Sequence, residues 1–147
     1  MKILVDADAC PVVKQVEEIA KKHNIETIIF SDTSHIFNSD YCEIRVVDQG
    51  ADAVDFAIMS VCKAGDIVVT QDYGVAAMAL GKGAKAIHHS GMEYTDANID
   101  RLLMDRHLAK KERAKGKHRV RSLIMDKVDG GFEEELERMV GRISDYI

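Results

Sequence analysis

The chain has 147 residues, of which 46% are hydrophobic and 31% are charged, and its formal net charge is −5. This length and composition are typical of one soluble globular domain that buries its core without disulfide or metal staples. Because the chain has no apolar run of about 18 residues and begins with a charged residue and a strand, we expect neither a transmembrane helix nor a signal peptide, and hence a cytoplasmic protein. The three cysteines are odd in number and show no CxxC spacing, which favours reduced thiols over a zinc site.

An apolar segment at the start of the chain runs directly into two carboxylates. Residues 3–5 are Ile, Leu and Val, which predict a buried parallel strand, and Asp6 and Asp8 follow. In open α/β sheets, ligands bind beyond the carboxyl ends of the strands. An extended backbone would place these two acids on one side, where like charges need a cation, a shared proton or water. The alternative is that Asp8 caps the next helix and Asp6 merely ends the strand.

A helix and a second strand come next. The apolar spacing of residues 12–20 predicts a helix that Pro11 opens and Asn24 ends. Residues 25–30 predict the strand, and the polar stretch 31–40 predicts a loop at its carboxyl end.

A third strand, residues 42–47, leads into a helix whose apolar stripe runs from Ala51 to Val61. Asp52 and Asp55 share another face of this helix and lie in its first two turns, next to the carboxyl end of the strand. Carboxylates in that position also favour the positive end of the helix dipole. This structural explanation suits Asp52 better than Asp55, which lies deeper in the helix.

A fourth strand, residues 67–69, ends in Thr70 and Asp72, and a helix follows at once, as at the start of the chain. A fifth strand ends at His88. Neighbours in a strand point to opposite faces, so we do not expect His88 and His89 to share a metal site. The alternation of strands and helices predicts a parallel sheet with right-handed crossovers.

The C-terminal third combines two helices with a dense block of positive charge. A long helix begins near Thr95, and a last amphipathic helix spans residues 132–143. From Arg101 to Arg121 the chain carries nine Lys or Arg against two acids, a local charge of +7, so the remainder carries −12. Such a block is either a solvated helix face or an electrostatic footprint for a polyanion. The candidate nucleic-acid-binding residues are Arg106, Lys110, Lys111, Arg113, Lys115, Lys117, Arg119 and Arg121.

Five aspartates fall at strand ends or in the helix turns next to them, which in a parallel sheet is a single edge. They are Asp6, Asp8, Asp52, Asp55 and Asp72. Carboxylates gathered in a cleft repel one another by several kcal/mol unless hard cations lie among them. Oxygen ligands without Cys or His suit Mg²⁺ or Mn²⁺, and two such ions about 4 Å apart can activate water and stabilise the leaving oxygen in phosphodiester cleavage.

Three motifs resemble those of PIN domains, metal-dependent nucleases that act mainly on RNA. They are the apolar strand ending in Asp6, the segment Ala51–Ala57 (ADAVDFA) and the segment Val68–Asp72 (VVTQD). The whole chain more closely resembles the YaiI/YqxD family of small, largely uncharacterised bacterial proteins with a PIN-like fold. The matching pieces are VDADACP, DTSH, DQGADAVDFAI, GDIVVTQDYG and YTDANIDRLL.

The resemblance implies an α/β fold, a PIN-like three-layer sandwich with a central parallel sheet of four to five strands and a helical C-terminal extension. It implies a single domain over residues 1–147, with the α/β core in residues 1–92 and the helical part in residues 93–147, including the basic segment 101–121.

The resemblance also implies roles for the acids. By position, Asp6, Asp55 and Asp72 match the PIN metal ligands, with Thr70 as the companion hydroxyl of Asp72. One PIN glutamate has no clear counterpart, so Asp8 or Asp52 would have to substitute for it among the catalytic residues.

Our first interpretation is a nuclease or nuclease-like phosphodiesterase that depends on Mg²⁺ or Mn²⁺. Its substrate would be RNA, single-stranded or structured, attracted by the basic segment through counterion release. Aromatic residues make up 5% of the chain, so the sequence does not support recognition by base stacking. We expect no membrane partner, and a homo-oligomer remains open.

Two alternatives belong to other classes. A haloacid-dehalogenase-like phosphatase would use Asp6 as a nucleophile, but the region after Thr70 offers Lys82 and Lys85 without the further acidic pair. A catalytically inactive PIN-like module would bind nucleic acid or a protein and would have kept only the fold.

Overall fold

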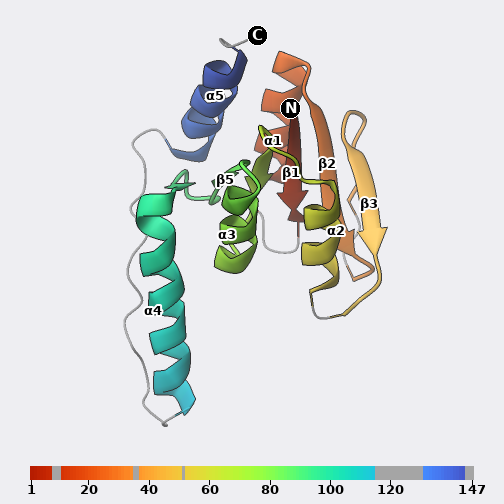
Figure 1. Ribbon diagram of the computed structural model, residues 1–147. Helices are drawn as coiled ribbons and strands as arrows, with labels where there is room; N and C mark the ends of the chain where they lie inside the picture. The colour runs from red at the N-terminus through yellow and green to blue at the C-terminus, as the bar shows by residue number, and fades with distance from the viewer. Residues whose placement is uncertain (8–10, 35–36, 51, 115–130, 145–147) are drawn as a thin grey trace.

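A six-stranded sheet with helices on both faces forms the centre of the computed structural model, which describes residues 1–7, 11–34, 37–50, 52–114 and 131–144 (Figure 1). The side chains of residues 106–114 and 142–144 lie outside this description. The strands are β1 (Lys2–Asp6), β2 (Glu26–Asp32), β3 (Glu43–Val47), β4 (Ile67–Val69), β5 (Lys85–Ile87) and β6 (Glu93–Tyr94). The helices are α1 (Val13–His23), α2 (Ala53–Val61), α3 (Tyr73–Gly81), α4 (Asp96–Ala114) and α5 (Gly131–Ser144).

The strand order is β3-β2-β1-β4-β5-β6, and the first five strands run parallel. This confirms the predicted α/β class and its parallel sheet. The sixth strand was not predicted, because its two residues are too few for an alternating pattern, and it pairs with β5 in the antiparallel direction. From β1 the chain moves outward to β2 and β3 on one side and continues with β4 and β5 on the other. The switch point, where ligands bind in open α/β sheets, therefore lies between β1 and β4.

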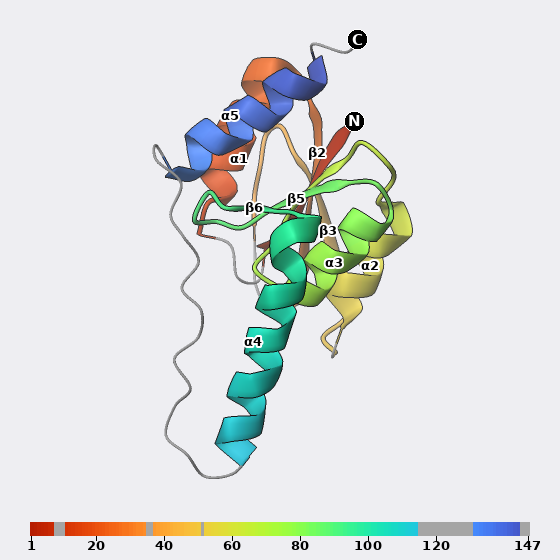
Figure 2. The same ribbon diagram turned by 60° about the vertical axis from the view of Figure 1, so that its left-hand side comes forward.

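Alternating residues of the buried strands feed two hydrophobic cores, one on each face. Ile3 and Val5 belong to a core with α1 and α5, and Leu4 and Val68 belong to a core with α2, α3 and α4. The three layers confirm the predicted sandwich. Each of the two C-terminal helices contributes to one of these cores, and Figure 2 shows α5 lying across α1.

Helix α4 reaches furthest from the sheet. It begins beside α3 and then runs past the carboxyl ends of the strands, as both views of the ribbon show (Figures 1 and 2). Among the described residues, no helix has the length and apolar character needed to cross a membrane.

Candidate active site

The switch point is occupied by Asp6 and Thr70. Val5 of β1 lies opposite Val69 of β4, so Asp6 and Thr70 follow side by side, and both point to the face of the sheet that carries α2 and α3. The Thr70 hydroxyl donates a hydrogen bond to Asp6 Oδ2 over 3.1 Å. Both residues are buried, with exposed fractions of 8% for Asp6 and 2% for Thr70. A carboxylate and a hydroxyl from different strands are thus joined at the place where the fold favours ligand binding.

The same hydroxyl connects Asp6 to Asp72. Thr70 Oγ1 accepts a hydrogen bond of 3.0 Å from the backbone N–H of Asp72. Asp72 is also the N-cap of α3, because its Oδ1 accepts from the N–H groups of Gly74 at 2.8 Å and Val75 at 3.2 Å. A Cβ on Gly74 would lie 3.1 Å from that oxygen, so the tight turn favours glycine. The sequence predicted Asp72 as a site residue and missed its capping role.

Tyr94 of β6 holds the backbone of Thr70 by a hydrogen bond. Its buried hydroxyl donates to the Thr70 carbonyl oxygen at 3.1 Å, and its ring packs edge-on against Tyr73, with 6.1 Å between the centroids. Burial raises the pKa of the Tyr94 hydroxyl far above its usual range, and the neighbouring Tyr73 and Asp72 raise it further. The neutral hydroxyl is therefore a dependable donor. Sequence reasoning missed Tyr94, although it belongs to the YTDANIDRLL motif.

The acids of α2 lie near the same edge of the sheet. Helix α2 packs against β1 and β2, and its first turn lies at the carboxyl ends of these strands (Figure 1). Asp55 in that turn is half-buried, whereas Asp52 is exposed at the N-cap in the left-handed conformation, with φ 67° and without a side-chain capping bond. Asp8 lies outside the described residues. The hydrogen bonds thus bring together Asp6, Thr70 and Asp72, with Asp55 on the covering helix.

The fit of these residues to a metal ion is partial. In the part of the chain that the structure describes, no three or more His, Cys, Asp or Glu side chains are grouped so as to hold a metal ion. Asp6, Asp55 and Asp72 therefore do not form a ready-made three-carboxylate site. Protein sites for Mg²⁺ often use only one or two carboxylates and take further oxygens from water and substrate phosphates. The oxygen-only chemistry of Asp6, Thr70 and Asp72 matches that simpler kind of site.

The structure adds Asp32 to the carboxyl edge. Strand β2 ends at Asp32, which shares a face with Phe30, and Phe30 lies opposite Asp6. Asp32 Oδ1 accepts the backbone N–H of Ser34 at 2.8 Å and contacts the Ser34 hydroxyl. These two contacts form a local turn. The sequence pattern used for β1 and β4, an apolar strand followed by an acid at its carboxyl end, would also have identified Asp32.

His88 and His89 contradict the expectation that they point apart. Strand β5 ends at Ile87, so the alternation of a strand no longer applies, and the two rings lie 4.1 Å apart between centroids. His88 Nδ1 accepts the backbone N–H of Ser90 at 3.0 Å. Burial, together with the smaller effect of the neighbouring His89, lowers the pKa of His88 to about 4. His88 is therefore a neutral ring at pH 7, held as the Nε2–H tautomer.

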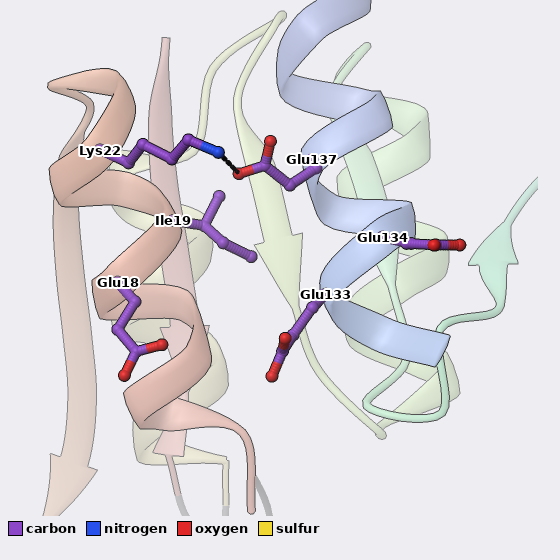
Figure 3. A pocket seen from close by; sticks show the side chains of 6 residues that line it. All are labelled: Glu18, Ile19, Lys22, Glu133, Glu134 and Glu137. Atoms are coloured by element: carbon purple, nitrogen blue, oxygen red, sulfur yellow. Dashed lines mark ion pairs between the residues drawn. The ribbon is translucent and has the colours of Figure 1, made fainter. Parts of the chain in front are cut away.

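A groove between α1 and α5 lies on the opposite face of the sheet from Asp6 (Figure 3). It has a volume of about 500 Å³ and is lined by Glu18, Ile19, Lys22, Glu133, Glu134 and Glu137. Lys22 pairs with Glu137 at 3.5 Å. Four carboxylates against one ammonium group do not suit a polyanion, so this groove is not part of the candidate site.

Some of the predicted basic residues lie in helix α4, and the others lie outside the described residues. Arg106, Lys110, Lys111 and Arg113 belong to the second half of α4, which extends beyond the carboxyl edge of the sheet (Figure 2). Lys115, Lys117, Arg119 and Arg121 lie outside the described residues.

Fold and site together define an α/β protein whose switch point holds the Asp6 carboxylate, bonded by the Thr70 hydroxyl, which in turn accepts the backbone N–H of Asp72. The family described as uncharacterized BCR, YaiI/YqxD family, matches residues 4–142. The chain therefore belongs to the YaiI/YqxD family, which confirms the resemblance of the whole chain to that family.

Curated relatives carry the name UPF0178 protein. One from Clostridium acetobutylicum is 53% identical over 145 residues, covering 97% of this chain and 98% of the relative. One from Lachnoclostridium phytofermentans is 51% identical over 148 residues, covering 98% and 99%. One from Ruminiclostridium cellulolyticum is 54% identical over 116 residues, covering 79% and 76%. No solved structure matches the chain.

Proposed function

We propose that this chain is a PIN-like phosphodiesterase that cleaves RNA with the help of Mg²⁺ or Mn²⁺. The observation that carries the proposal is the Thr70 hydroxyl, which bonds the Asp6 carboxylate on one side and the Asp72 backbone on the other at the switch point. Two acids and a shared hydroxyl in this position suit a reaction that places a phosphate among oxygen ligands.

The chain's own residues divide into ligands and supports. Asp6 and Asp72 would hold the metal together with water and phosphate oxygens, and Asp55 on the covering helix, with Asp8 or Asp52, would assist. Such a metal supplies Lewis-acid chemistry, because it polarises the phosphate and lowers the pKa of bound water. Thr70 orients Asp6, and the neutral Tyr94 hydroxyl fixes the Thr70 backbone. This support resembles the outer shell of metal sites, where groups behind the ligands set their orientation.

RNA is the proposed substrate because positive charge accompanies the site. The segment from Arg101 to Arg121 carries a charge of +7 in a chain of net charge −5. Residues 101–114 of this segment belong to α4, which extends past the carboxyl edge of the sheet (Figure 1). Lys and Arg bind the phosphate backbone by releasing counterions, without reading the sequence. Binding should therefore weaken as salt rises.

Cleavage of a labelled single-stranded RNA by the purified chain tests the proposal. We expect cleavage with Mn²⁺ or Mg²⁺, none with EDTA, and none with Asp72→Asn. Asparagine is as good an N-cap as aspartate, so Asp72→Asn should keep α3 while removing a charged ligand. Glu134→Gln, in the groove between α1 and α5, is the matched control for loss of one carboxylate and should cleave normally.

Three outcomes would contradict the proposal. Undiminished cleavage by Asp72→Asn would assign the activity to another site or to a contaminant. RNA binding without metal-dependent cleavage would indicate the inactive module. A phosphoenzyme trapped at Asp6 during hydrolysis of a phosphomonoester would indicate the phosphatase.

A further inference from the structure

Arg45 lies in line with the candidate site, on the edge strand β3. The sheet register places Asp6 opposite Phe30 and Phe30 opposite Arg45, so the three residues form a row across β1, β2 and β3. Residues opposite one another in parallel strands point to the same face. Arg45 thus shares the face of Asp6, and their backbones are separated by two strand spacings, roughly 10 Å.

The guanidinium group turns inward along this row. Its central carbon lies 6.0 Å from the centroid of the Phe30 ring, and Phe30 is completely buried beside Asp6. A cation over an aromatic face is attracted by the ring, which holds the group toward the sheet. The Arg45 side chain is 43% exposed, so the positive charge remains accessible.

Glu43 orients the Arg45 side chain but contacts only one of its three guanidinium nitrogens in the described part of the chain. The Glu43 carboxylate, on the same face of β3, contacts Nε of Arg45. In the described part of the chain, no other hydrogen-bond or ion-pair partner is found for the two terminal nitrogens. A guanidinium held by ring and carboxylate is pre-organised to offer a fork of N–H groups to an anion with several oxygens.

We propose that Arg45 is a phosphate-binding subsite, which holds the phosphate neighbouring the one at Asp6. This inference rests on the proposed function, because it needs a substrate with more than one phosphate. The row then has two ends with different tasks. Asp6 and Thr70 mark the reacting phosphate, and Arg45 fixes the direction in which the RNA strand leaves past the carboxyl ends of β2 and β3.

Binding can be measured without cleavage in an Asp6→Asn background. In a fluorescence-anisotropy titration with a labelled single-stranded RNA, Arg45→Gln should weaken binding by about tenfold at low salt, the scale of one charge-assisted contact. The slope of log affinity against log salt should fall by about 0.7, the value for one phosphate of a single strand. Arg45→Lys should keep the slope but bind more weakly, because an ammonium lacks the planar fork.

Two controls separate phosphate binding from folding. Arg138→Gln removes another partly exposed arginine that contacts a glutamate, on α5 at the opposite face, and should leave RNA binding unchanged. Arg45→Met keeps a long apolar stem over Phe30, so it should melt like the unaltered chain and yet bind RNA like Arg45→Gln. If Arg45→Gln shows the affinity and salt slope of Arg138→Gln, Arg45 is not a phosphate contact.

Kinetics give a second and independent test. Bis(4-nitrophenyl) phosphate carries one phosphate only, so Arg45→Gln should hydrolyse it as well as the unaltered chain does, while the KM for an RNA oligonucleotide rises about tenfold. An equal loss on both substrates would overturn the subsite. If the unaltered chain cleaves neither substrate, the proposed function fails, and the anisotropy titration still decides whether Arg45 binds phosphate.

Discussion

Two buried aspartates lie at opposite ends of the sheet and are bound in different ways. Asp66, at the amino end of β4, is 2% exposed and accepts the backbone N–H groups of Lys2 and Lys63, each at 2.9 Å, with the Lys2 ammonium at 3.2 Å. Asp6, at the carboxyl end of β1, is 8% exposed and accepts the hydroxyl of Thr70.

The hydrogen-bond donors described for the two acids differ in kind. Two fixed N–H groups and an ammonium commit Asp66 to the fold, because they tie β1 to the turn before β4. The Thr70 hydroxyl both donates to Asp6 and accepts the backbone N–H of Asp72, so its bond to Asp6 sets the orientation of the carboxylate. The amino end of the sheet thus uses its acid for stability, whereas our proposed function uses the acid at the carboxyl end to bind a ligand.

Asp6→Asn should have the largest effect, and on activity alone. RNA cleavage should fall on the order of a thousandfold, the scale of losing a group that acts in the chemical step. Asparagine keeps an oxygen that accepts the Thr70 hydroxyl, so the melting temperature should change little. Parallel cleavage assays and thermal melts check this. A collapse of stability instead would make Asp6 a structural acid like Asp66.

Asp66→Asn should show the opposite pattern. The amide keeps one acceptor but loses the charge that pairs with Lys2, and its NH₂ group meets a backbone N–H. We expect the free energy of unfolding to fall by about 3 kcal/mol, as when one member of a largely buried pair is removed. Urea denaturation measures this loss. The activity per folded molecule should stay unchanged, and a selective loss of activity would break the contrast between the two ends.

Much of this contrast follows from strand patterns that the sequence shows. Continuous apolar runs at residues 3–5 and 67–69 predict buried parallel strands, and their order along the chain predicts that Asp6 and Asp72 share one edge. The positions of Asp6, Thr70 and Asp72 confirm that they meet there.

What escaped prediction depends on contacts between distant segments. Tyr94 lies in a strand of two residues, which exists because β5 offers an edge, and its bond to Thr70 spans 24 residues. His88 and His89 stack because β5 stops one residue earlier than its composition suggests. Arg45 gained its place from the register of three strands, which no local pattern specifies.

His88, at the carboxyl end of β5, should make the folded chain less stable in mild acid. Burial keeps the pKa of His88 in the folded chain at about 4, against an ordinary value of 6.5. Between these values the unfolded chain binds a proton that the folded chain excludes, so stability is complete above pH 6.5 and falls as the pH drops toward 4. We expect a loss of roughly 2 kcal/mol for this half-buried ring. Urea titrations at several pH values should show it, and His88→Asn should abolish it.

The α1–α5 contact should give the smallest effect, in a more acidic window. The hydrogen bond from His23 lowers the pKa of Glu137, and the nearby charges of His23 and Lys22 lower it further. A depressed carboxyl pKa contributes stability above the unfolded value of 4.5, and that contribution is lost as the pH falls through the folded pKa. Because Glu137 is partly exposed, less than about 1 kcal/mol is expected.

Glu137→Gln isolates this contribution, since it should reduce the pH dependence below pH 4.5 by the share of this one carboxyl and leave the His88 step above it intact. Because the two pH ranges differ, one series of urea titrations measures the stability contribution of the α1–α5 contact separately from that of the carboxyl edge. If Glu137→Gln also flattened the step between pH 6.5 and 4, that step would belong to the α1–α5 contact, and His88 would have no part in the acid sensitivity of the carboxyl edge.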